Sequence, residues 1–126
     1  MAQINLGAFG YNEFVAKSGA YTVTAADSGT VINVTATATI TLPATVVGIS
    51  PIIRVGADGI TVTVQPNASD NIYGGQLTAV DNKALIFTNA PVGSYVQLVA
   101  DGTTAGGWAI ARLDAGGQSA TVTKAP

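Results

Sequence analysis

The sequence predicts an all-β fold, a compact antiparallel β sandwich or barrel of about eight to ten short strands. The first observation behind this prediction is a run of 26 residues, from Ser28 to Ile53, without a charged side chain. Between Ile32 and Leu42 apolar residues alternate strictly with Thr or Asn. This period of two is typical of strands with one apolar and one hydroxylated face. The second observation is the short spacing of Gly, Pro, Asp and Asn turn signals.

Ten strand-like runs lie between these turn signals, and most are rich in β-branched residues. They span residues 20–25, 30–35, 38–42, 52–55, 60–65, 71–73, 84–88, 94–100, 108–113 and 120–123. Asp-Gly pairs, which favour tight hairpin turns, occur at Asp58-Gly59 and Asp101-Gly102. The best helical candidate, around residues 78–83, is one turn at most.

The alternating segment is longer than an ordinary strand of about 5–6 residues. We therefore expect a hairpin that turns near Ala36-Thr37. Its Thr face is expected to meet neighbouring molecules, because the cores of protein–protein interfaces are depleted of charge.

Composition divides the chain into three expected segments. Residues 1–19 form an N-terminal arm or first strand, 20–113 the β domain, and 114–126 a Gly/Ala/Thr-rich tail or edge strand. The 126 residues suit one domain with its own core. The aromatic residues near the start leave two roles open for the first segment. It either packs on the chain's own core or docks onto a partner subunit.

Charge is scarce in this chain and excludes several partners. Charged residues make up 10% of the sequence, against about 25% in an average soluble domain. A surface with so few charges tends to associate, so we expect an oligomer or larger assembly. The five basic residues are scattered singly, which argues against a nucleic-acid partner. The alternation interrupts the roughly 20 apolar residues that a membrane helix needs, so no membrane partner is expected.

Few residues can support catalysis. The absence of His and Cys removes the usual general base, the commonest metal ligand and any thiolate. Five acidic residues stand near Gly or Asn at turn positions, where Asp bonds backbone N–H groups; these are Asp27, Asp58, Asp81, Asp101 and Asp114. Asp70 lies among oxygen-bearing side chains, but without EF-hand spacing, which favours loop capping over calcium binding. We expect no enzyme, no catalytic residue, no metal and no cofactor.

Trp108 is the one tryptophan and follows Gly106-Gly107. The favoured interpretation is a core anchor at the start of a strand, since large aromatic side chains dominate core packing. A stacking platform for a sugar ring and a contact between subunits are the alternatives.

The order of motifs resembles a known family. The motifs are Tyr21 to Gly29, Ile40 to Pro43, Val55 to Val62, Pro66 to Gly74, and Gly93 to Gly102 leading into Gly107-Trp108. In this order they resemble a recurrent β domain of tailed-bacteriophage virion proteins, found in head decoration (cement) or fibre proteins and in tail fibres or spikes. The resemblance covers residues 20–113 and implies a non-enzymatic role in assembly or display, often as a homotrimer.

From the resemblance we expect a capsid decoration protein on the outer surface of the phage head, made in the host cytoplasm. The expected partners are the major capsid protein and further copies of the chain in a homotrimer. The candidate capsid or inter-subunit contacts lie in the first segment and are Ile4, Leu6, Phe9, Tyr11 and Phe14. The alternative is a receptor- or glycan-binding module of a phage head or tail fibre. A polysaccharide-degrading enzyme with two catalytic Asp residues is the least favoured hypothesis.

Overall fold

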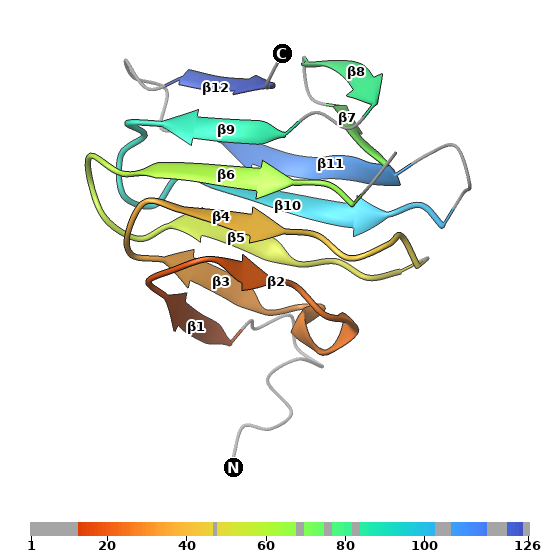
Figure 1. Cartoon of the computed structure of the whole chain (residues 1–126), viewed down its shortest axis with the longest axis horizontal. Helices are drawn as coiled ribbons and strands as arrows, with labels where there is room; N and C mark the ends of the chain where they lie inside the picture. Colours follow the sequence, from red (N-terminus) through yellow and green to blue (C-terminus); the bar gives the residue numbers. More distant parts are fainter. Residues whose placement is uncertain are drawn as a thin grey trace.

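The computed structural model describes residues 13–46, 48–67, 70–74, 77–81, 84–102, 107–115 and 121–124, with the backbone alone for 77–81 and 121–124. Two β-sheets face each other across a shared core (Figure 1). Sheet A has seven strands in the order β1-β3-β5-β10-β11-β7-β8, and sheet B has five in the order β12-β9-β6-β4-β2. The predicted all-β sandwich is confirmed.

The strands are short, as the spacing of turn signals predicts. Their bounds are β1 Phe14–Lys17, β2 Tyr21–Thr22, β3 Val31–Val34, β4 Ala38–Thr41, β5 Ile52–Val55, β6 Thr61–Gln65, β7 Asn71–Gly74, β8 Leu77–Asp81, β9 Leu85–Thr88, β10 Tyr95–Ala100, β11 Gly107–Asp114 and β12 Thr121–Lys124. A one-turn 3₁₀ helix, Ala25–Asp27, follows β2. The segment expected to hold at most one helical turn forms β8 instead, because it pairs antiparallel with β7.

The first six strands wind back and forth between the two sheets in successive turns, which we call coils. They alternate between the sheets, so that β1, β3 and β5 pair in parallel in sheet A while β2, β4 and β6 pair in parallel in sheet B. Parallel neighbours need a crossover connection, and here each crossover passes through the opposite sheet. Both sheets are therefore mixed, which corrects the expectation of a wholly antiparallel sandwich. The later strands β9 and β10 join antiparallel to β6 and β5.

The expected hairpin near Ala36-Thr37 is wrong. The chain does turn there, but β3 lies in sheet A and β4 in sheet B, so the turn is an arch between the layers. Ile32 and Val34 enter the core from one sheet, and Ile40 enters from the other. The arch buries both apolar faces in one core without changing the alternation.

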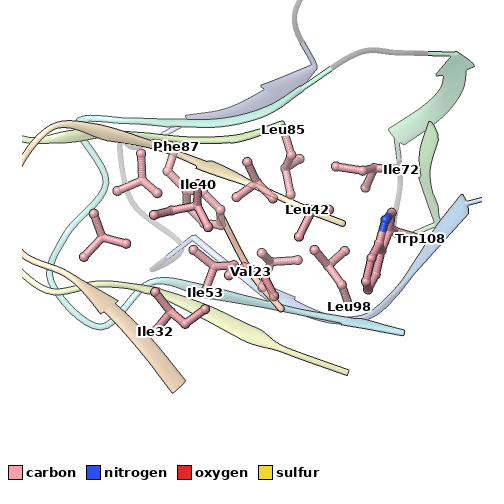
Figure 2. Close-up of a cluster of buried hydrophobic side chains, with 14 of the residues drawn as sticks. Val23, Ile32, Ile40, Leu42, Ile53, Ile72, Leu85, Phe87, Leu98 and Trp108 are labelled. Atoms are coloured by element: carbon pink, nitrogen blue, oxygen red, sulfur yellow. The ribbon is translucent and has the colours of Figure 1, made fainter. Parts of the chain in front are cut away.

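The core lies between the two layers and consists mainly of Val, Ile and Leu. Figure 2 shows these side chains, with Trp108 beside Ile72 on the paired strands β11 and β7. Phe87 of β9 is also fully buried. Complete burial of one such aliphatic or aromatic side chain contributes about 1.5–3 kcal/mol. Alternate residues of the same strands project from the outer faces of the sandwich, where the candidate contact surfaces lie.

Candidate interaction surface

Trp108 belongs to the core. Its side chain has 0% exposed area and lies on β11 between Ala100 of β10 and Ile72 of β7 in the strand register. A ring with no exposed face cannot stack on a sugar, so the core-anchor interpretation is the one that the structure supports. The Trp108 Nε1 atom has no hydrogen-bond partner within the described part of the chain.

Three of the five acidic residues assigned to turns have hydrogen bonds that fit this role. Asp27 Oδ2 accepts hydrogen bonds from the Thr24 backbone N–H at 2.8 Å and from the Tyr21 hydroxyl at 2.7 Å. Asp58 Oδ1 accepts one from the Val92 backbone N–H at 2.8 Å, which ties together two loops. These carboxylates hold loops in place.

Asp101 holds the connection between β10 and β11. Its carboxylate accepts hydrogen bonds from the Gly107 backbone N–H at 3.1 Å and from the Tyr73 hydroxyl at 2.8 Å. The hydrogen bond to this carboxylate, with some help from burial, raises the pKa of Tyr73 above its usual value. Tyr21 has a raised pKa for the same reason, with Asp27 as its partner.

Asp70 lies in the loop between β6 and β7. Its backbone N–H donates to the Asn67 carbonyl at 2.7 Å, and its Oδ2 is buried without a partner among the described residues, so loop capping by this side chain stays a prediction. Across those residues no group of three or more His, Cys, Asp or Glu side chains could hold a metal ion.

The outer face of sheet B is lined with hydroxyl groups. We call it the threonine face, and among residues with described side chains it consists of Thr22, Thr39, Thr41, Thr61, Thr63, Gln65, Ile86 and Thr88. Its inward-facing alternates include Val62, Val64 and Leu85, which are fully buried. Thr39 pairs with Thr63, and Thr61 pairs with Thr88, across neighbouring strands. Thr39 and Thr41 of the predicted hydroxylated face therefore lie here, but Asn33 of the same alternation lies on the outer face of sheet A, because the arch divides β3 and β4 between the sheets.

The outer face of sheet A is different, because it carries both arginines of the chain. We call it the arginine face, and define it by Phe14, Asn33, Arg54, Tyr95, Gln97 and Arg112. The strand register places Asn33, Arg54 and Tyr95 in one row across β3, β5 and β10. Their inward alternates Val34, Val55 and Val96 are buried at 0–1% exposure, so this row projects outward.

Of the predicted contact residues, Ile4, Leu6, Phe9 and Tyr11 lie outside the described residues. Phe14 begins β1 and is 59% exposed on the arginine face, so it does not pack into the chain's own core. The sequence argument did not single out Arg54 or Arg112. The signal for Arg54 was available, since it stands between Ile53 and Val55 in a predicted strand.

In comparisons with known proteins, no protein-family model matches the chain, and no curated protein matches it either. In the described residues, no helix has the length and apolar character needed to cross a membrane.

Proposed function

We propose that this protein is a non-enzymatic capsid decoration (cement) protein of a tailed bacteriophage. In this proposal it sits on the outer surface of the head, with the major capsid protein and its own copies as partners. The proposal rests on the motif order that resembles phage virion β domains and on the all-β sandwich that this resemblance implies. Each copy would bridge neighbouring capsid subunits by non-covalent contact, and many copies together would resist the outward pressure of packaged DNA.

The threonine face is the observation that most supports an assembly role. All of its described members are uncharged, whereas stable monomer surfaces carry roughly 25–35% charged residues. Five strands spaced about 4.8 Å apart make a surface about 19 Å across. A stable interface buries about 800 Å² on each partner, so a face of this size suits one of several contacts in a repeated assembly.

The alternative is a receptor- or glycan-binding module of a phage head or tail fibre. Trp108 cannot be the stacking platform of such a module, because that ring is fully buried. Among the described aromatic side chains, Phe14 is exposed and Tyr21, Tyr73 and Tyr95 are partly exposed. Measured binding to host cells or polysaccharide would favour this alternative.

Imaging of particles made with and without this protein tests the proposal. A difference map should show extra density on the outer surface of the head, repeated at equivalent positions on the lattice. Density on the tail alone would contradict a decoration role and favour the fibre alternative. Deletion of residues 2–12, which ends before β1, tests in the same particles whether the first segment is needed for attachment.

A further inference from the structure

The arginine face holds a guanidinium group in a fixed orientation. Arg54 Nη1 donates a hydrogen bond to Asn33 Oδ1 at 2.6 Å, and the guanidinium carbon lies 5.4 Å from the centroid of the Phe14 ring. Two neighbours from two strands, Asn33 of β3 and Phe14 of β1, therefore position this one charged group.

This charged group has no carboxylate partner within the described part of the chain, where its one hydrogen bond is to Asn33. A guanidinium carries five N–H donors arranged to match a carboxylate in a bidentate pair. Four donors are therefore left for solvent or for a group on another molecule. Because the orientation is already fixed, little side-chain entropy is lost when such a group binds.

A β-bulge brings the second arginine to the same face. In β11 Trp108 and Ile110 point inward, and strict alternation would send Arg112 inward as well. The register between β10 and β11 shifts at Gln97/Leu98, so that Leu98 pairs with Ile110 while Gln97 pairs with Arg112. The extra residue turns the Arg112 side chain outward, since a bulge re-aims the residues that follow it.

The neighbours of the two arginines are those of a protein-binding surface. Phe14 is 59% exposed beside Arg54, and the half-buried Tyr95 and Gln97 lie between the strands that carry the arginines. Aromatic residues and Arg are enriched in interfaces and dominate their binding energy. Asp114 also projects from this side of β11, so the two arginines outnumber the acidic side chain on a chain whose net charge is −2.

We infer that the arginine face is the surface that docks onto the capsid. Its partner site would be a protein surface that presents an Asp or Glu carboxylate to Arg54 and an apolar side chain to Phe14. This inference rests on the proposed function and adds to it the face, the central residue and the chemistry of the partner site. Arg112 would add a second, more exposed attraction for acidic groups around that site.

Addition of purified protein to heads that lack it tests this inference, with bound copies measured against protein concentration. Arg54→Gln and Phe14→Ser should each weaken binding about tenfold or more, because each removes one side of the contact. Arg54→Lys keeps the charge but loses the planar fork, so it should bind more like Arg54→Gln than like wild type. Raising the ionic strength from about 0.05 M to about 0.5 M should weaken wild-type binding more than that of Arg54→Gln.

Lys17→Gln is the matched control. Lys17 Nζ lies 4.0 Å from the centroid of the Tyr21 ring, so this change also removes one positive charge and one cation–aromatic contact, but away from the arginine face. Its binding should stay within about twofold of wild type, because Lys17 contacts Tyr21 and not the arginine face. Thermal unfolding of every variant shows whether it is folded before binding is compared.

The outcomes separate the two proposals. Wild-type binding that Arg54→Gln and Phe14→Ser leave unchanged overturns the docking inference, while the proposed function stands. Heads that take up no wild-type protein overturn both. If Arg54→Gln instead changes the sedimentation of the free protein, the arginine face joins copies of this chain, and the capsid assignment is wrong.

Discussion

Asn33 of β3 packs closely against Gly56, in the loop after β5. Its amide oxygen accepts the hydrogen bond from Arg54, and the same oxygen would lie 2.7 Å from a Cβ added at Gly56. Glycine at position 56 therefore leaves the space in which Asn33 holds the guanidinium.

Gly56→Ala should destabilise the fold by about 0.5–1.5 kcal/mol, because the added methyl group meets the end of the Asn33 side chain and displaces it from its hydrogen bond with Arg54. It should also release Arg54 from Asn33. Urea denaturation measures the first effect, and the chemical shift of the Arg54 Nε–H group reports the second. Gly19→Ala is the control, since a Cβ there meets nothing within 4 Å, and it should leave stability unchanged or slightly improved.

The two tyrosine–aspartate hydrogen bonds predict how stability depends on alkaline pH. They raise the pKa of Tyr21 and Tyr73 in the folded state, so the neutral phenol is favoured by folding. This stabilisation is complete below the unfolded pKa of about 10 and is lost as the pH rises through the folded pKa. Thermal unfolding from pH 8 to about 11.5 should show the loss.

Tyr73→Phe should shrink that alkaline loss, and it should cost about 0.5–1.5 kcal/mol at neutral pH through the missing hydrogen bond. Tyr21→Phe should act in the same direction at the other end of the molecule. If stability falls as steeply with rising pH in the double variant Tyr21→Phe/Tyr73→Phe as in wild type, these tyrosines do not cause the loss.

The position of an individual residue, in the core or in a turn, can be predicted when its side-chain chemistry and immediate neighbours alone determine it. Trp108 was assigned to the core because its large apolar ring gains most from burial, and Asp27, Asp58 and Asp101 to turns because of their neighbours. Arg54 and Arg112 were not predicted as partners on one face. Their shared face depends on pairing between distant strands and on a bulge in β11, neither of which local sequence specifies.

At the scale of elements, alternation located the strands but not the layers. The period of two continues from Ile32 to Leu42 whether the chain makes a hairpin or an arch, because both keep the apolar residues on one side. Tertiary packing decides between them.

Two strands were missed or left open for a related reason. The sequence leaves residues 1–19 open as an arm or a first strand. Four of them, Phe14–Lys17, form β1 through parallel pairing with β3. β8 is paired with β7 in a segment whose composition favours no single structure. Short strands of this kind take their structure from their neighbours rather than from propensity.

The coil arrangement predicts an order of local stability. β5 and β6 each have a partner strand on both sides, whereas the two-residue β2 has β4 alone within the described sheet. Amide hydrogen exchange should therefore be slowest in β5, β6 and β10 and fastest in β2, because exchange follows local opening. Equal protection of β2 and β6 would contradict the arrangement of coils.

For the whole molecule, the scarcity of charge predicts association. At micromolar concentrations, sedimentation analysis of the proposed homotrimer should give a mass about three times the chain mass of 12.6 kDa. The threonine face is the candidate contact between copies. Thr39→Lys and Thr63→Glu, made as separate variants, each place a charge on that face and should each weaken association. A wild-type protein that remains monomeric at the highest soluble concentration would contradict the trimer.

The central claim is that this protein strengthens a phage head by non-covalent contact. The most direct measurement is the temperature at which heads release their DNA, compared for decorated heads, bare heads and bare heads given the purified protein. The claim predicts release from bare heads at a temperature several degrees lower, with full recovery on addition of wild-type protein and little recovery with Arg54→Gln. Identical release temperatures for decorated and bare heads would contradict it.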